Sequence, residues 1–418
     1  MLVFKFGGAS VKDAAGIINL SKVVEKYKHE KLLIVVSAMG KTTNALERLT
    51  KAYVNQSDGI QLIYNEIKEY HYAILSELFD HSHPVFDDVE NTFVEIDWMI
   101  EDEPHDDYDF IYDQIVSIGE LVSTRIINAY LNQVGLTSKW LDVRGYIHTD
   151  NTYREGIVEW QKTCTHIEQE LPALLEKNII VTQGFLGGTS ENFTTTLGRE
   201  GSDYTAAIFA SCLKAESVTT WKDVPGILNA DPKLFTDTVK FDRLSYTEAI
   251  EMTYYGAAVI HPKTIKPLQN AHIPLLVKPF NDPDAAGTII SETGLHQYEK
   301  PVIIVKQNQV LVSVSAKDYS FITEDHLSAV FTLFAKYHVK INVMQVSALS
   351  ISVCFDYREG KFEKLLQALS QDFNHKYNSE LTLITLRHYK ADELRNLTGD
   401  RKVLLEQTSR NTAQVVLK

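Results

Sequence analysis

Short apolar runs alternate with amphipathic helical segments through the first two thirds of the chain. Residues 2–6 and 32–36 are apolar almost throughout, a pattern typical of buried parallel strands. Each run ends in a polar loop that contains glycine, and a helical pattern follows. The alternation predicts an α/β domain with a mainly parallel sheet, in which ligands bind at the carboxyl ends of the strands. Further strands are predicted at residues 139–144, 178–182, 217–221 and 275–278.

Residues 55–131 are predicted to be largely helical. The acidic stretch 87–113 is interpreted as a solvated helix face and loop rather than a metal site. Apolar residues at helical spacing predict a buried helix over 111–130, and Glu120 lies near its apolar side. A carboxylate there needs a cationic partner, unless Glu120 is a surface residue at the helix edge. Two more helices are predicted, over residues 154–176 and 245–255.

The pattern changes near residue 292. Residues 281–301 are rich in Asp, Pro, Gly, Ser and Thr, so we predict two domains, 1–292 and 293–418. The second domain is predicted to be ferredoxin-like, with the order βαββαβ, and its tail strands are expected to pair with residues 302–305. Its predicted elements are strand 310–314, helix 327–337, strands 341–346 and 351–355, helix 362–369, strand 381–386, and tail strands 403–406 and 413–417.

Composition and charge narrow the class of protein. The 418 residues are more than one hydrophobic core usually covers. The net charge of 41 − 55 = −14, with no basic cluster, argues against nucleic-acid binding. Cys164, Cys212 and Cys354 are far apart, so neither a disulfide framework nor a zinc site is expected. No signal peptide and no membrane-spanning run is recognised, and we expect a cytoplasmic protein without membrane contact.

Residues 194–207 concentrate groups that bind anions. They combine hydroxyls and glycines with one cation, Arg199, and one carboxylate, Asp203, just before an apolar helical segment. A helix N-terminus presents unpaired N–H groups, and Arg199 is able to hold a carboxylate by two parallel hydrogen bonds. Asp203 is able to position a cation or a nucleophile. The plain alternative is a surface turn capped by Ser and Asp.

Two glycine motifs do not match nucleotide-binding fingerprints. Gly40-Lys41-Thr42 resembles the end of a P-loop, but the first glycine of that motif is replaced by Val35. Lys5-Phe6-Gly7-Gly8 is not a GxGxxG motif, and a tight turn after a surface lysine explains it equally well. The stronger indication is convergence at the ends of strands of one sheet, where phosphates and carboxylates would meet. The converging residues are Lys5, Ser37, Thr43, Arg199, Ser202 and Asp203.

Taken in order, these motifs resemble those of aspartokinases in the amino-acid kinase superfamily. The resemblance covers nearly the whole chain. It implies a three-layer αβα sandwich followed by a ferredoxin-like ACT regulatory region, whose second ACT domain is truncated. The matching motifs are Lys5-Phe6-Gly7-Gly8, Val36-Ser37-Ala38, Gly119-Glu120, Thr182-Gln183-Gly184-Phe185, Thr195-Thr196-Leu197-Gly198-Arg199, Gly201-Ser202-Asp203, Asp223-Val224-Pro225-Gly226-Ile227, Asp231-Pro232 and His261-Pro262.

The resemblance also implies a reaction. Aspartokinases transfer the γ-phosphoryl group of MgATP to the side-chain carboxylate of L-aspartate and form 4-phospho-L-aspartate. This is the first step toward lysine, threonine and methionine. The implied catalytic residues are Lys5, Arg199 and Asp203, with Mg²⁺ arriving on ATP and not bound directly by the protein. No general base is needed, because the attacking carboxylate is ionised at neutral pH.

The remaining roles follow from the same resemblance. Arg199 would clamp the substrate α-carboxylate and Glu120 its ammonium, with Thr43, Thr196 and Ser202 completing the site. The implied ATP-binding residues are Lys5, Phe6, Gly7, Gly8, Ser37, Lys222, Asp223, Leu228, Lys233, Ala258 and Val259.

Several positions depart from the family pattern. Ala9 stands where Thr is usual, and Ala258 and Leu228 replace frequent polar or Tyr residues, so altered ATP contacts are expected. Asp325-His326 replaces a glycine of the effector loop, and Asn342 and Ala348 replace acidic residues. Inhibition by lysine is therefore expected to be weak, absent or replaced by another amino acid. The candidate effector residues are His326, Leu327, Asn342 and Ser347.

Two alternative functions remain open. One is another acyl-phosphate kinase, acting on glutamate or an acylated amino acid. The other is a non-catalytic amino-acid sensor, although such a protein would be expected to lack Lys5, Arg199 or Asp203. No dinucleotide-binding unit follows the regulatory region, so a monofunctional enzyme is expected. A homo-oligomer, a dimer or larger, is expected through the ACT-like sheets.

Overall fold

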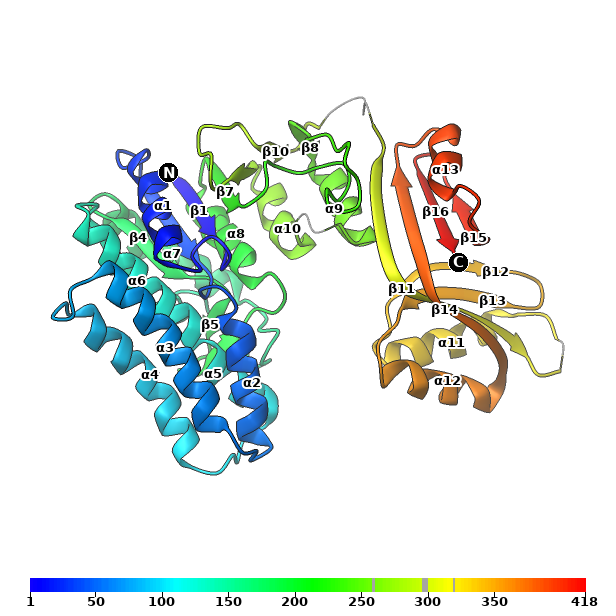
Figure 1. Ribbon diagram of the computed structural model, residues 1–418, viewed down its shortest axis with the longest axis horizontal. Coiled ribbons are helices and arrows are strands. Elements are labelled where there is room, and N and C mark those ends of the chain that lie inside the picture. The colour runs from blue at the N-terminus through cyan, green and yellow to red at the C-terminus, as the bar shows by residue number, and fades with distance from the viewer. Residues whose placement is uncertain (258–259, 295–299, 319) are drawn as a thin grey trace. The chain divides into compact units, whose positions relative to one another are not determined.

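The computed structural model describes residues 1–257, 260–294, 300–318 and 320–418, which form two compact units (Figure 1). The predicted boundary after residue 292 remains a prediction, because each unit also draws on segments from the other side of it. The first unit contains Met1–Ile227, Lys240–Ile250 and Ile260–Gly294, and the second contains Leu228–Val239, Glu251–Val259 and Leu295–Lys418.

The first unit is built on an eight-stranded sheet. All neighbouring strands are parallel except β9 and β10, which confirms the mainly parallel sheet. β10 lies inside the stretch that the sequence suggested as a linker, since a four-residue strand leaves little pattern to read. In sheet order the strands are β3 (Ser138–Leu141), β4 (Ile179–Gln183), β2 (Leu32–Val36), β1 (Leu2–Phe6), β7 (Ser217–Lys222), β9 (Leu275–Pro279), β10 (Thr288–Ser291) and β8 (Arg243–Ser245).

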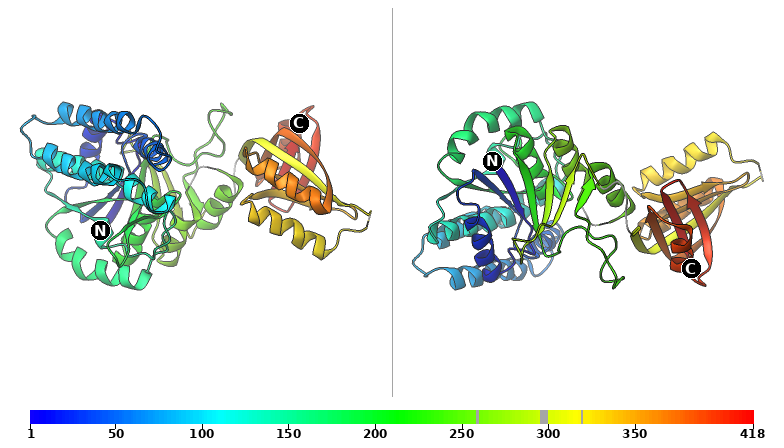
Figure 2. Two further views of the ribbon diagram at one scale, coloured as in Figure 1. Left: turned by 90° about the horizontal axis from the view of Figure 1, so that it is seen from below. Right: turned by 90° about the horizontal axis from the view of Figure 1, so that it is seen from above.

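Helices cover both faces of this sheet, as the three-layer prediction requires (Figure 2). α6 packs on β2, β3 and β4, with α1 and α4 beside it, whereas α7 and α8 pack on the sheet from the other side. The helical prediction for residues 55–131 is confirmed. The helices are α1 (Ala14–Glu25), α2 (Thr42–Val54), α3 (Ile60–Leu78), α4 (Val85–Glu101), α5 (Tyr108–Val116), α6 (Ile118–Gln133), α7 (Trp160–Leu175), α8 (Gly201–Leu213) and α10 (Pro262–Asn270), while α9 (Tyr246–Tyr255) contributes to both units.

Two local expectations for the first unit are wrong. The helix expected over 154–176 begins only at Trp160, because residues 150–158 form a loop whose ends pair through a bridge between Thr149 and Val158. The cysteines were expected to be unpaired, but Cys164 of α7 forms a disulfide with Cys212 of α8. The separation of 48 residues in the sequence concealed that these two helices pack together.

The second unit contains an antiparallel six-stranded sheet. The order β11-α11-β12-β13-α12-β14 confirms the ferredoxin-like prediction. Residues 302–305 pair with β14 and not with the tail strands, because β14 is long enough to bind them on one edge and β16 on the other. In sheet order the strands are β12 (Ile341–Val346), β13 (Ile351–Asp356), β11 (Val302–Ala316), β14 (Phe373–Arg387), β16 (Thr412–Leu417) and β15 (Val403–Thr408), and the helices are α11 (Glu324–Lys336), α12 (Lys361–Asp372) and α13 (Ala391–Thr398).

The core of the second unit follows from strand alternation. Val310, Val312 and Val314 of β11 face α11 and α12, where Val330 and Leu365 cover them. The tail strands and α13 add a smaller cluster around Ile384 and Val415 of β14 and β16. Across the described ranges of both units, no helix is long and apolar enough to cross a membrane.

Candidate active site

A cavity of about 890 Å³ opens in the first unit, where β1, β2 and β6 end and where α2, α6 and α8 begin. It brings together residues that lie more than 190 positions apart, such as Lys5 and Asp203. The residues that the sequence singled out and that line it are Lys5, Ser37, Thr43, Glu120, Thr196, Arg199, Ser202 and Asp203.

Lys5 and Asp203 form a buried ion pair at the cavity wall. Lys5 extends from β1, and its Nζ lies 2.8 Å from Oδ2 of Asp203 in the first turn of α8. Thr220 of β7 donates its hydroxyl to the other carboxylate oxygen at 3.3 Å. Burial opposes ionisation of Asp203, but the charges of Lys5 and Lys222 outweigh it and hold the pKa of Asp203 below its usual value. The pair therefore places a fixed cation and a fixed anion side by side.

Two glycines permit close backbone approach around this pair. A Cβ on Gly8 would lie 2.5 Å from the carbonyl oxygen of Ala38, so the loop after β1 packs directly on the loop after β2. A Cβ on Gly184 would lie 2.4 Å from Cβ of Ser202, so the end of β4 touches the first turn of α8. Larger side chains at either glycine would push the cavity walls apart.

Glu120 is buried in the first turn of α6, so the alternative of a surface residue is wrong. Its side chain is 2% exposed, and the Ala38 N–H donates to Oε1 at 3.3 Å. Oε2 has no hydrogen-bond partner within the described part of the chain. Burial raises the pKa of Glu120 to about 8. The cavity thus contains a carboxyl group with one unpartnered oxygen, and this group would gain its charge beside a cation.

Arg199 lies on the connection between β6 (Thr194–Thr196) and α8. Among the described residues no carboxylate is paired with its guanidinium, which lines the cavity. The anion-binding stretch 194–207 begins in a short antiparallel hairpin of β5 (Leu186–Gly188) with β6, and not in a loop. Glu200 in left-handed conformation, with φ +55°, turns the chain from this hairpin into α8.

Sequence reasoning assigned no role to a further group of cavity residues, four of which come from loop 150–158, part of which was wrongly assigned to a helix. Arg154 is the notable one, because it adds a third cation to the cavity. Its guanidinium lies 4.4 Å from the ring centroid of Tyr112 and 3.2 Å from Oδ1 of Asp109. Its place beside Glu155 and Gly156 in a polar run was the one available signal. The missed residues are Asn44, Asp109, Tyr112, Thr152, Tyr153, Arg154, Glu155, Phe185, Gly198, Glu200 and Gly201.

The predicted ATP residues belong to both units of the chain. Gly7 follows β1 beside the cavity, but the side chain of Phe6 is fully buried and stacks on Trp221, which leaves only its backbone for a ligand. Lys222 and Asp223 lie at the end of β7. Leu228 and Lys233 belong to the second unit, and Ala258 and Val259 lie outside the described residues, so these assignments remain predictions.

The four candidate effector residues already have structural partners. His326 accepts the Thr323 N–H at the start of α11, and Leu327 packs on the core. Asn342 bonds Lys306, Gln309 and Asp356 in one polar network. Ser347 closes the turn after β12 through Ser350 and lies at the opposite end of that strand from Asn342. An effector site at these residues remains a prediction.

Comparisons with known proteins show which sequences and structures this chain is similar to. The model of the "Amino acid kinase family" matches residues 1–279. Aspartokinase 1, chloroplastic, of Arabidopsis thaliana is 31% identical over 411 residues, which cover 95% of this chain and 70% of that protein. Structures of E. coli aspartokinase III, one with lysine and aspartate and one with aspartate and ADP, are 26% identical with TM-scores of 0.84. They align over the whole of this chain and 95% and 96% of their own.

Proposed function

The chain belongs to the aspartokinases of the amino acid kinase family, and we propose that the cavity around Lys5, Glu120 and Asp203 is its active site. An aspartokinase uses ATP to phosphorylate the side-chain carboxylate of L-aspartate, the first step toward lysine, threonine and methionine. The proposal therefore concerns which residues perform this reaction in this chain.

The unpartnered oxygen of Glu120 carries the proposal. Oε2 of Glu120 is buried without a partner among the described residues, and Glu120 lines the same cavity as Arg199, whose guanidinium has no paired carboxylate there. An α-amino acid presents one ammonium and one carboxylate, which match this anion and this cation. A substrate held by both groups presents its side chain toward the rest of the cavity, where Lys5 and Asp203 lie.

Lys5 would stabilise the transferring phosphoryl group. One side-chain oxygen of aspartate attacks the γ-phosphorus, the bond to the β–γ bridging oxygen breaks, and ADP leaves with those electrons. Negative charge shifts across the phosphoryl oxygens during transfer, so a fixed cation and the backbone N–H groups of Gly7 and Gly8 lower the barrier. Asp203 holds the Lys5 ammonium in place through their 2.8 Å contact.

Mg²⁺ belongs to the proposal as a companion of ATP. Within the described ranges, no three His, Cys, Asp or Glu side chains gather in a way that would hold a metal ion. Bound with the phosphates, Mg²⁺ would neutralise part of their charge. Asp203 is the ionised carboxylate beside the phosphoryl-binding lysine, and we assign it to face that ion. Lys222, Asp223, Leu228 and Lys233 are the proposed nucleotide contacts.

Regulation by an amino acid is the finer part of the proposal. The E. coli enzyme was crystallised with lysine, whereas Asn342 in this chain is engaged with Lys306, Gln309 and Asp356. We therefore expect lysine to inhibit weakly or to be replaced by another amino acid. β12 and β15 are the edge strands of the six-stranded sheet, and we propose that pairing there forms the homo-oligomer.

Acyl-phosphate formation is the direct test. The folded protein with MgATP should yield a hydroxamate in the presence of hydroxylamine with L-aspartate and not with L-glutamate or N-acetylglutamate. Each substrate is assayed with and without lysine, threonine or methionine. Tight inhibition by lysine would refute the regulatory proposal, and a signal only with another substrate would refute the assignment of the cavity to aspartate.

Arg199→Ala should raise the KM for aspartate by roughly 10- to 100-fold, because a charge-assisted pair with the α-carboxylate is lost. The kcat should change by a smaller factor, since the proposed contact of Arg199 is with the substrate α-carboxylate and not with the transferring phosphoryl group. Arg48→Ala is the matched control, because Arg48 is exposed on α2 and pairs only with Glu66 at 3.8 Å among the described residues. An unchanged aspartate KM in Arg199→Ala would show that the carboxylate lies elsewhere.

A further inference from the structure

We propose that Asp113 is a positioning residue that holds three separate segments of the substrate cavity in register, a role that rests on the proposed active site. Asp113 lies on α5 at the end of the acidic stretch 87–113. That stretch was expected to face solvent, but the side chain of Asp113 is completely buried. A buried carboxylate is costly unless donors surround it, so its partners define its role.

The partners of Asp113 are all residues of the cavity wall. Oδ2 accepts the N–H of Arg154 and the N–H of Thr196, each at 2.8 Å. Oδ1 accepts the hydroxyl of Thr196 at 2.7 Å. Both Arg154 and Thr196 line the cavity, as does Tyr112, the residue before Asp113. One carboxylate therefore joins α5, the tip of loop 150–158 and β6, which no other side chain in the described cavity wall does.

The hydrogen bond to Asp113 matters for Arg154 because the backbone of Arg154 is in an unfavourable conformation. Its φ is +66°, a left-handed conformation that is unfavourable for an arginine. The bond from its N–H to Asp113 fixes that backbone, and the neighbouring Tyr112 supplies the ring over which its guanidinium lies at 4.4 Å. Asp113 thus fixes the backbone of this cation, and Tyr112 together with Asp109 fixes its head group.

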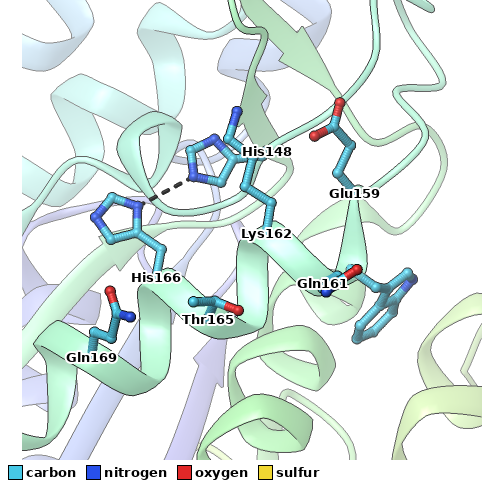
Figure 3. A pocket seen from close by; sticks show the side chains of 8 residues that line it. His148, Glu159, Gln161, Lys162, Thr165, His166 and Gln169 are labelled. Atoms are coloured by element: carbon cyan, nitrogen blue, oxygen red, sulfur yellow. Dashed lines mark hydrogen bonds between the residues drawn. The ribbon is translucent and has the colours of Figure 1, made fainter.

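The base of the same loop is held without Asp113. The Gly156 N–H donates to the carbonyl oxygen of Thr196 at 2.9 Å, and the hydroxyls of Thr149 and Thr195 lie 2.6 Å apart. Next to Thr149, the ring of His148 forms a hydrogen bond of 3.2 Å with the ring of His166 on α7, at the pocket shown in Figure 3. Loss of Asp113 should therefore loosen the tip of the loop and leave its base and the fold in place.

The ionisation of Asp113 fits this role. Burial raises its pKa to about 6, although the hydrogen bonds from Arg154 and Thr196 oppose the rise. The group is mainly ionised at neutral pH, where it is able to accept every one of these bonds. Asparagine retains one accepting oxygen for the two N–H groups, whereas alanine retains none, so the two substitutions separate geometry from charge.

The test compares Asp113→Ala, Asp113→Asn and the control Asp87→Asn, an exposed residue of the same acidic stretch. Asp113→Ala should raise the aspartate KM by about 10- to 100-fold, since two backbone donors and a hydroxyl lose their acceptor. In the same variant, the kcat and the KM for MgATP should change less than about threefold. Asp113→Asn should recover part of the lost affinity for aspartate. Asp87→Asn should match the wild type.

Hydrogen exchange supplies a readout that needs no turnover. In Asp113→Ala, amides of the loop tip, residues 152–155, should exchange faster, while those of Gly156 at the base and of α7 stay protected. An equal fall in activity toward both substrates, with faster exchange throughout the unit, would assign Asp113 a merely structural role and overturn the proposal. Unchanged exchange at residues 152–155 would overturn it as well. If the wild type formed no aspartyl phosphate, the proposed function would fail, and the exchange experiment would still decide whether Asp113 holds the loop.

Discussion

Lys5→Ala should lower kcat by about 100- to 1,000-fold while the aspartate KM changes only a few-fold, because the lysine acts mainly on charge that develops during transfer. The side chain is buried at the end of β1, and Asp203 fixes its ammonium at 2.8 Å. A cation held in this way needs no reorganisation when the phosphoryl group moves. Steady-state kinetics, with the concentrations of aspartate and MgATP varied in turn, would measure kcat and each KM separately.

A second variant separates catalysis from folding. Lys5→Ala leaves the carboxylate of Asp203 buried without its cation, which lowers stability. Lys5→Ala combined with Asp203→Asn removes that uncompensated charge, so the melting temperature should recover while activity stays low. Lys41→Ala is the matched control, because Lys41 is exposed in the motif that only resembles a P-loop. Near wild-type kcat in Lys5→Ala would place the phosphoryl site elsewhere.

The sheet and the main cavity could be predicted because their signals are local. The runs that became β1, β2 and β4 are short and mainly apolar, which is the pattern of strands buried on both faces. In a parallel sheet the carboxyl ends of such strands share one edge, so Lys5 and Ser37 had to lie together. The ferredoxin-like order in the second unit was readable for the same reason, since alternating valines mark a strand with one buried face.

The residues that the sequence did not reveal depend on long-range contacts. Asp113 has the composition and spacing of its solvated acidic neighbours, and only donors 41 and 83 residues away make it a buried acceptor. The loop tip at Arg154 was hidden for a similar reason, because its polar run continues smoothly into α7. Cys164 and Cys212 likewise meet only through the packing of α7 on α8. No local periodicity encodes any of these contacts.

Glu120 was predictable in part, because its helix is a local feature and its contacts are long-range. Its helix and its apolar side were readable from spacing, so the need for a cationic partner could be stated from the sequence. The sequence could not show how the two carboxyl oxygens are used. One accepts the Ala38 N–H, a contact that spans 82 residues, and the other has no partner in the described structure. Because this oxygen has no partner in the described structure, we predict that the ammonium group of a ligand binds it.

Aspartate should bind more tightly as the pH rises from about 6 to about 8, because binding draws a proton out of Glu120. In the ligand-free protein, burial raises the pKa of Glu120 to about 8, so the carboxyl group holds its proton at neutral pH. The substrate ammonium favours the carboxylate and lowers that pKa in the complex. The proton must leave when aspartate binds at pH 7, and a lower pH opposes binding.

Calorimetry in two buffers of different ionisation enthalpy would count this proton. At pH 7 the wild type should release nearly one proton per aspartate bound, and the release should fade above about pH 8, where Glu120 is already ionised. Glu120→Gln should bind aspartate roughly 100-fold more weakly, because an amide is a poor partner for an ammonium, and its binding should release no proton. The control is Glu47→Gln, a partly exposed partner of Lys51 on α2 at 2.8 Å, which should bind and release as the wild type does. Proton release that persists in Glu120→Gln would assign the titrating group to another residue and remove Glu120 from the ammonium site.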